Sequence, residues 1–251
     1  MSGGGNQIAG TTAVVTGASR GFGRAVAEAL CKAGAEVIGI ARDRTRLEEV
    51  QARVGGAFVP VGADATDPTV AGLLLEQHRP RTLVLNAGAT PLPRPIHHHT
   101  WQTFTRNWDV DVQHVFHWIR EALLLPLGPG STIITMSSGA ALRGSPISGG
   151  YAGAKATIRF ITSYAAEESE RAGLGLQFVS LLPGLTPATD LGAIGARGYA
   201  RRAGVDLDTF LDGFGPSPTP EGVGDAVIEL VGGGFTAGSY QVTDAGLAEA
   251  P

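Results

Sequence analysis

Short runs of apolar residues alternate along the whole chain with longer stretches in which apolar residues recur every three or four positions. Short continuous runs are typical of strands buried on both faces of a sheet, and the longer spacing is typical of helices. The predicted strands are 13–16, 36–40, 57–61, 82–85, 132–136, 177–181 and 240–243. The predicted helices are 22–33, 45–53, 68–78, 101–125, 151–172 and 220–231. This alternation predicts an α/β fold, a parallel sheet of about seven strands with helices on both faces.

The predicted helix 101–125 carries one apolar face. Its members are Trp101, Phe104, Trp108, Val112, Val115, Ile119 and Leu123. We expect this face to pack on the core, and a share in a subunit interface is the alternative. No linker or charge block divides the chain, so residues 1–251 are interpreted as a single domain. The one long irregular segment expected is 185–220, and a loop of that length is typically functional or disordered.

Composition narrows the function classes. A net charge of −4 and a pI near 5.9 argue against a partner that is a nucleic acid or an anionic membrane surface. The single cysteine, Cys31, excludes an internal disulfide and suits a cytoplasmic protein. No apolar run approaches the roughly 20 residues that a membrane span needs. The first seven residues have no basic segment followed by an apolar one, so we expect no signal peptide.

A glycine-rich turn, Thr-Gly-Ala-Ser-Arg-Gly-Phe-Gly, joins the first predicted strand to the first predicted helix. Glycines let the backbone turn sharply and approach a ligand closely. The helix N-terminus offers unpaired N–H groups and a positive dipole end to a pyrophosphate. The residues predicted to bind a dinucleotide here are Gly17, Ser19, Arg20, Gly21, Phe22 and Gly23.

Tyr151 and Lys155 lie one helical turn apart, so their side chains project from the same helix face. A free phenol ionises near pH 10, and ionising it near pH 7 costs about 4 kcal/mol. A positive charge about 4 Å away supplies about 4 kcal/mol at an effective dielectric constant of about 20. One lysine is therefore enough to make the tyrosine a usable general acid or base. An exposed polar pair is the alternative interpretation.

Ser138 follows the apolar run 132–136, at the end of a parallel strand where open α/β sheets bind ligands. A hydroxyl there can bond to a substrate carbonyl oxygen; a serine that merely forms a turn is the alternative. The glycine turn, Asn86-Ala87-Gly88 and then Ser138 with Tyr151-x-x-x-Lys155 occur in this order. The ordered set resembles the short-chain dehydrogenase/reductase family, and the resemblance covers nearly the whole chain.

The resemblance implies a doubly wound Rossmann sheet and hydride transfer between a nicotinamide cofactor and a carbonyl/alcohol pair. In that family Tyr151 would be the proton donor, Lys155 would bind the nicotinamide ribose, and Ser138 would orient the substrate. The further cofactor contacts that it implies are Asn86, Ala87, Gly88, Asp64, Pro183 and Gly184.

One departure from the family falls in the site itself. Alignment puts Asp111 where an asparagine normally holds the water of a proton relay. An aspartate can still accept from that water, but if it is ionised near Lys155 it offsets the effect of the lysine on Tyr151. We hypothesise a retained relay with a shifted pH profile. A register slip is the competing explanation, because Asn107 lies one turn earlier.

Smaller departures lie in three segments. The doubled asparagine of the family is Leu85-Asn86 here, and its Asp-Gly-Gly is Asp244-Ala245-Gly246. Its threonine after Pro183-Gly184 is replaced by Ala188, with Thr186 and Thr189 nearby. The sequence therefore does not predict which residue of this loop contacts the nicotinamide carboxamide.

The second predicted strand leads into Ala41 and Arg42, where enzymes that use NAD place a carboxylate for the ribose hydroxyl. Arg42 and Arg20 suit the 2′-phosphate of NADPH, which guanidinium groups bind with charge-assisted hydrogen bonds. The sequence therefore predicts NADPH over NADH. In the alternative, Asp43 reaches the ribose, although Asp43 or Thr45 is expected to cap the next helix.

Two further features carry less chemistry. His97, His98 and His99 are consecutive and point in different directions, so we predict a solvated loop and no metal site. Residues 185–220 correspond to the substrate lid of the family, and their mixture of charged and apolar side chains selects no substrate class.

These observations predict a cytoplasmic, NADPH-dependent reductase of a small-molecule ketone or aldehyde, assembled as a homodimer or homotetramer. The family commonly pairs the helices matching 101–125 and 151–172 across a dimer interface. One alternative is an NAD-dependent alcohol dehydrogenase. The other is a nucleotide-binding sensor or scaffold whose catalysis Asp111 impairs.

Overall fold

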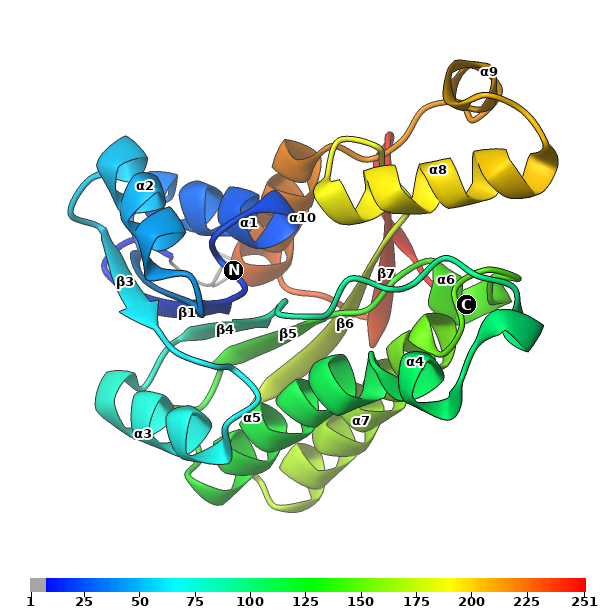
Figure 1. The fold of residues 1–251 in the computed structure, drawn as a ribbon. Coiled ribbons are helices and arrows are strands. Elements are labelled where there is room, and N and C mark those ends of the chain that lie inside the picture. The colour runs from blue at the N-terminus through cyan, green and yellow to red at the C-terminus, as the bar shows by residue number, and fades with distance from the viewer. Residues whose placement is uncertain (1–7) are drawn as a thin grey trace.

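The computed structural model describes residues 8–251, which form an eight-stranded sheet with helices on both sides (Figure 1). The first seven residues, in which we expect no signal peptide, lie outside the described residues. The strand order is β3-β2-β1-β4-β5-β6-β7-β8. The strands are β1 Thr12–Thr16, β2 Glu36–Ala41, β3 Phe58–Gly62, β4 Thr82–Leu85, β5 Thr132–Met136, β6 Gln177–Pro183, β7 Ser239–Thr243 and β8 Gly246–Glu249. Neighbours from β3 to β7 are parallel, and β8 runs antiparallel to β7.

The seven parallel strands confirm the predicted fold class. All five residues of β5 are buried, as expected for a strand covered on both faces. Strand β8 was not expected, because its four residues are mostly exposed and form no apolar run. It pairs with β7 through a turn at Asp244 and Ala245.

The helices form two layers (Figure 1). On one side lie α1 (Gly21–Lys32), α2 (Arg44–Val54) and α10 (Pro220–Gly233). On the other side lie α3 (Pro68–His78), α5 (Gln113–Leu124) and α7 (Tyr151–Arg171). Each layer has its own buried apolar cluster: Leu30 and Val227 belong to the first, and Trp118 and Ile158 belong to the second. The partly buried Cys31 packs against the first cluster.

The segment 101–125 is not one continuous helix. It consists of α4 (Trp101–Thr105), a π-helical turn η2 (Trp108–Val112) and α5. The wider turn changes which residues face inward, so Val115 and Ile119 are buried whereas Trp101 is 76% exposed and Trp108 38%. The prediction of a core-facing face is thus correct for its second half and wrong at its start.

The segment 185–220 is largely helical, contrary to the expectation of an irregular loop. It contains α8 (Asp190–Ala203) and α9 (Leu207–Asp212), which begin at the side-chain caps Thr189 and Asp206. Glycine-rich composition concealed α8. Its Gly192 lies so close to the Thr186 carbonyl oxygen that a Cβ would meet that atom at 1.7 Å.

The three consecutive histidines lie where the chain enters α4. His97 and His98 are exposed in a 3₁₀ turn, η1 (Ile96–His98), which leads into α4. Residues 8–251 contain no group of His, Cys, Asp or Glu that could hold a metal ion. Among the helices of the same residues, none is long and apolar enough to cross a membrane.

Candidate active site

A cavity of about 1200 Å³ opens at the carboxyl ends of the central strands. The residues predicted from the sequence converge on it, although they come from many parts of the chain. Those lining it are Gly17, Ser19, Arg20, Gly21, Phe22, Arg42, Asp64, Asn86, Ala87, Gly88, Asp111, Ser138, Tyr151, Lys155, Pro183 and Gly184. Gly23 does not line it.

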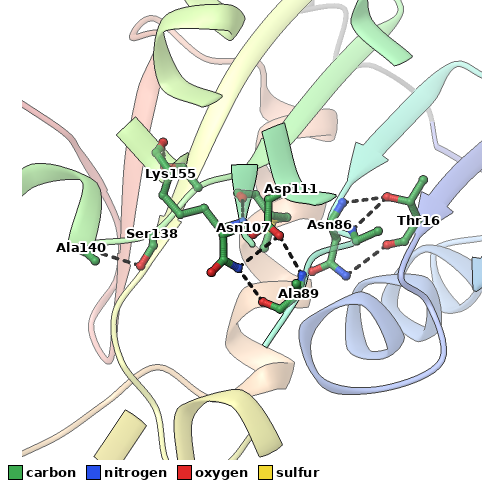
Figure 2. Close-up of polar contacts among 11 residues, drawn as sticks. Thr16, Asn86, Ala89, Asn107, Asp111, Ser138, Ala140 and Lys155 are labelled. Atoms are coloured by element: carbon green, nitrogen blue, oxygen red, sulfur yellow. Dashed lines mark hydrogen bonds and ion pairs between the residues drawn. The ribbon is translucent and has the colours of Figure 1, made fainter. Parts of the chain in front are cut away.

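The glycine turn is pinned to the end of β4 by Asn86 (Figure 2). The Asn86 side-chain amide donates to the carbonyl oxygens of Thr16 at 3.1 Å and Gly17 at 3.3 Å. The Thr16 hydroxyl oxygen accepts from the Asn86 backbone N–H at 2.9 Å. A Cβ on Gly23 would lie 2.3 Å from the Gly17 oxygen, so Gly23 permits the close turn and needs no contact with a ligand. Gly17 has a φ of +67°, which also favours glycine.

Helix α1 begins at the cavity without a side-chain cap. Its N-cap residue, Arg20, makes no capping hydrogen bond. By contrast, the side chains of Asp43, Asp67 and Thr189 cap α2, α3 and α8. The exposed N–H groups and dipole of α1 therefore suit an anionic ligand such as a pyrophosphate. The residues present fit the dinucleotide that the turn predicts.

Cationic and anionic side chains follow β2 at the same cavity. Asp43 accepts from the Arg46 backbone N–H at 3.2 Å and also pairs with the Arg46 side chain at 3.4 Å. Asp43 is thus the cap of α2, one of the two residues expected for that role. Arg42 lines the cavity beside them.

Asp64 lies in the turn after β3. Its carboxylate accepts from the Thr66 backbone N–H at 3.0 Å and from the Thr66 hydroxyl at 2.9 Å. The backbone N–H of Thr66 is the main reason that the pKa of Asp64 is lowered. The buried indole of Trp118 supports this turn from beneath, because its N–H donates to the Ala65 carbonyl oxygen at 2.9 Å.

Arg20 reaches across the cavity in this structure. Its guanidinium lies 2.9 Å from the carboxylate of Asp190, the first residue of α8. Both side chains are more than half exposed, and pairs of this kind contribute little to stability. The contact links the glycine turn to α8.

Lys155 and Asp111 form a buried ion pair. The ammonium nitrogen of Lys155 lies 3.1 Å from Asp111 Oδ2, and the two side chains are only 7% and 1% exposed. The same nitrogen donates to the Met136 carbonyl oxygen at 2.9 Å. Burial opposes the charge on Lys155, but the charges of Asp111 and then Tyr151 outweigh it and raise the pKa of Lys155.

The neighbours of Asp111 fix its orientation (Figure 2). Its Oδ1 accepts from the Ala89 backbone N–H at 2.7 Å and from the Asn107 amide at 3.4 Å. Asn107 also donates to the Ala89 carbonyl oxygen at 2.8 Å and does not line the cavity. A Cβ on Gly88 would lie 2.9 Å from Asp111 Oδ2, so a glycine leaves room for the carboxylate. Asp111, and not Asn107, therefore faces Lys155.

Tyr151 and Ser138 complete this end of the cavity. Tyr151 opens α7, and the Lys155 ammonium lies 5.6 Å from the centre of its ring. The Ser138 hydroxyl oxygen accepts from the Ala140 backbone N–H at 3.2 Å, where α6 (Ala140–Arg143) begins. The adjacent Ser137 is buried and donates to the Lys155 carbonyl oxygen at 2.8 Å, which ties β5 to α7.

The loop after β6 also faces the cavity. Thr186 and Thr189 line it together with Pro183 and Gly184, whereas Ala188 does not. Hydroxyl groups are thus available in this loop although the threonine usual in the family is absent.

Several residues of the site carry no signal in the sequence. Met136 contributes only its backbone oxygen, and Trp118 acts through a turn that is distant in sequence. Arg46 lines the cavity from the first turn of α2, whereas Arg42 lies before that helix. Tyr199 lines it from α8, which was not expected to be a helix.

Comparisons with known proteins identify the family. The sequence profile described as short chain dehydrogenase matches residues 11–195. A protein named "Probable NADP-dependent dehydrogenase" from Haemophilus influenzae is 30% identical over 88% of this chain and 87% of its own length. "Serine 3-dehydrogenase" from Rhizobium radiobacter is 34% identical over 69% of this chain and 71% of its own.

Solved structures share the fold. A dehydrogenase/reductase from Sinorhizobium meliloti is 28% identical, with a TM-score of 0.77 over 93% of this chain and 94% of that one. A 3-ketoacyl-(acyl-carrier-protein) reductase from Brucella melitensis, complexed with NADH, has a TM-score of 0.78 at 24% identity, over 94% of this chain and 98% of that one. The chain belongs to the short-chain dehydrogenase/reductase family and is an oxidoreductase of that family, whose members use NAD or NADP.

Proposed function

We propose that this enzyme uses NADPH to reduce the carbonyl group of a small ketone or aldehyde. One observation carries the proposal: the Lys155 ammonium lies 5.6 Å from the Tyr151 ring centre, in the cavity on which the uncapped helix α1 opens. A dinucleotide site and a proton donor are thus adjacent. Residues 1–251 act as one catalytic domain in this proposal, with 185–220 as the substrate lid.

The chain's own groups have the following roles in the reaction. The Ser138 hydroxyl donates a hydrogen bond to the carbonyl oxygen, and the Tyr151 hydroxyl gives that oxygen its proton. Lys155 favours the phenolate left on Tyr151, and Asp111 keeps Lys155 protonated and oriented. NADPH, when bound, supplies the hydride that the carbonyl carbon gains. The carbonyl thereby becomes an alcohol, and Tyr151 regains a proton from solvent.

The charges at the adenosine end support NADPH over NADH. Arg42, Arg46 and Arg20 line that end of the cavity and offer cationic partners to a 2′-phosphate. Asp43 already accepts from the Arg46 backbone N–H and caps α2, which leaves it less available to a ribose hydroxyl. The remaining contacts to the cofactor come from the lining residues predicted above.

Exposed aromatic side chains support assembly as a homodimer or homotetramer. Phe160 and Tyr164 stack on the surface of α7 and are 60% and 59% exposed, and Phe116 on α5 is 49% exposed. Large apolar side chains gathered on two helices are typical of a subunit interface. The single cysteine suits the reducing cytosol, where we expect the enzyme to act.

A panel of ketones and aldehydes with NADPH and NADH tests the proposal in wild-type enzyme and in Tyr151→Phe. We expect turnover with NADPH that Tyr151→Phe lowers by about 10²- to 10⁴-fold. The charge on Asp111 favours a second candidate, a nucleotide-binding protein with little catalysis, because a carboxylate beside Lys155 offsets its effect on Tyr151. Tight NADPH binding without turnover that depends on Tyr151 would support that candidate. If the enzyme instead oxidises alcohols with NAD faster than it reduces carbonyl compounds with NADPH, it is an NAD-dependent alcohol dehydrogenase.

A further inference from the structure

A set of aromatic rings lines the cavity beyond the reacting groups. Tyr199 on α8 and Phe210 on α9 have ring centroids 6.2 Å apart and planes only 5° from parallel. Phe210 and Phe214 follow at 5.6 Å. All three line the cavity and are only partly buried, so their rings form an apolar wall, here called the aromatic wall.

The aromatic wall is fastened to the segment that carries the proton donor. The Tyr199 hydroxyl hydrogen-bonds to the Ser145 hydroxyl. Next to it, Gly198 packs so closely that a Cβ would lie 2.6 Å from Pro93 and 3.0 Å from Ile147. The segment that contains Ser145 continues into α7. At that point the Tyr151 backbone N–H donates to the Ser148 carbonyl oxygen at 3.0 Å. These contacts fix the position of the aromatic wall relative to Tyr151, and both line the same cavity.

The surroundings of the aromatic wall are largely apolar. Leu142, Ile147, Leu185 and Leu191 line the cavity with it. Most of the charged lining residues are engaged elsewhere: Arg20 with Asp190, Asp111 with Lys155, and Asp43 with Arg46. The exceptions are Arg143, which is exposed at the end of α6, and Arg42, which is exposed after β2. A neutral, flat, apolar group matches this environment better than a polyol or an amino acid does.

From this arrangement we infer that the substrate is a ketone or aldehyde whose carbonyl is attached to, or lies within, an apolar ring system. The ring lies against the Tyr199 and Phe210 faces while the carbonyl oxygen reaches Ser138 and Tyr151. Offset stacking on aromatic side chains favours a planar ring over an equally apolar flexible chain. This inference rests on the proposed carbonyl reduction and specifies its substrate class.

Ketones with equal carbon number test the inference. Acetophenone, cyclohexyl methyl ketone and 2-octanone share their carbon count and differ in being aromatic, cyclic and linear. With NADPH, we expect wild-type kcat/KM to decrease in that order. Phe210→Leu keeps an apolar side chain and removes the ring, and should lower kcat/KM for acetophenone about 2- to 12-fold relative to 2-octanone, the range of one aromatic pair. Phe210→Tyr keeps the ring and should retain the preference for acetophenone.

Binding to a variant with little turnover separates this inference from the proposed function. The Kd values of acetophenone and 2-octanone are measured with the NADPH complex of Tyr151→Phe, with and without Phe210→Leu. Tighter binding of acetophenone that Phe210→Leu removes supports the inference even if no ketone is reduced by wild type. Equal Kd values for the two ketones, or a preference that survives Phe210→Leu in a folded variant, would overturn it. Reduction of all three ketones at the same rate would overturn it while leaving the proposed reductase intact.

Discussion

Replacing Asp111 with asparagine removes a buried negative charge and leaves the shape of the side chain nearly unchanged. The Asp111 carboxylate lies 3.1 Å from the Lys155 ammonium, so the variant leaves that ammonium without its counter-charge. Lys155 then acts on Tyr151 unopposed. We expect the pH midpoint of turnover, in the direction in which Tyr151 acts as the base, to move to lower pH.

The distances set the size of the shift. The Lys155 nitrogen is 5.6 Å from the Tyr151 ring centre, so its charge favours a phenolate by about 3 kcal/mol at an effective dielectric constant of about 20. Asp111 Oδ2 is 3.1 Å from that nitrogen and so at most about 8.7 Å from the ring centre. At that distance its charge cancels at least about 1.9 kcal/mol. Removing it should lower the midpoint by at least about 1.4 pH units.

The assay is kcat/KM for oxidation of the best alcohol with NADP, measured from pH 5 to pH 11. Asp109→Asn is the matched control, because it removes the same charge from an exposed position in the same π-helical turn. We expect its midpoint to equal that of wild type. Thermal unfolding of each variant is measured alongside, because removing one partner of a buried ion pair can cost about 3–5 kcal/mol.

The reasoning predicts a lower midpoint in a variant that remains folded at the assay temperature. A midpoint that stays at the wild-type value would mean that Asp111 does not act on Tyr151 through charge. A midpoint that rises would mean that Lys155 loses its own proton once Asp111 is gone. Either result refutes the account of this pair.

Three further predictions concern the cofactor and the core. Asp190→Asn frees Arg20 from an exposed pair and should tighten NADPH binding by up to about fivefold, measured as Kd by fluorescence titration. Arg42→Asp should reverse the preference for NADPH over NADH in the ratio of kcat/KM values. His114 is fully buried, and burial followed by the Lys155 charge lowers its pKa to about 3. Between pH 6.5 and pH 3, His114 is therefore protonated in the unfolded chain but not in the folded chain. The free energy of unfolding falls as the pH falls through this range. Between pH 7 and pH 5, the free energy of unfolding measured with urea should therefore fall by about 2 kcal/mol less in His114→Gln than in wild type.

Each of these three variants has a control and an outcome that would contradict the prediction. For Asp190→Asn, NADH is the control, because it lacks the 2′-phosphate; an equal gain for both cofactors would argue against Arg20 as the phosphate ligand. For Arg42→Asp, an unchanged preference would place the selection elsewhere. For His114→Gln, exposed His98→Gln is the control, and identical acid sensitivity of wild type and His114→Gln would contradict the burial argument.

The elements that could be predicted are those whose signal is local. Buried apolar runs such as β5 and the spacing of Tyr151 and Lys155 on one helix follow from neighbouring residues alone. The π-helical turn was invisible, because an apolar residue every three or four positions fits a continuous helix equally well. Helix α8 was missed because its glycines disfavour a helix locally, while close packing at Gly192 and Gly198 requires them.

The remaining features depend on contacts between distant parts of the chain. The position of Asp111 and its nearness to Lys155 were expected from the family resemblance, whereas the direct contact at 3.1 Å is a property of the folded chain. Arg20 was expected to select the cofactor, and its contact with Asp190, 170 residues away, is a property of the folded chain only. The same holds for the aromatic wall, since Tyr199 and Phe210 come from two helices within a segment expected to be irregular.

Single-turnover reduction by wild type and Tyr151→Phe, each saturated with NADPH, tests the central claim most directly. The loss of the proton donor should slow the chemical step by about 10²- to 10⁴-fold. The NADPH Kd should stay within about threefold, because the substitution leaves unchanged the glycine turn and the arginines that we propose hold the dinucleotide. A Tyr151→Phe enzyme that reduces its carbonyl substrate within tenfold of the wild-type rate would contradict the assignment of Tyr151 as the acid.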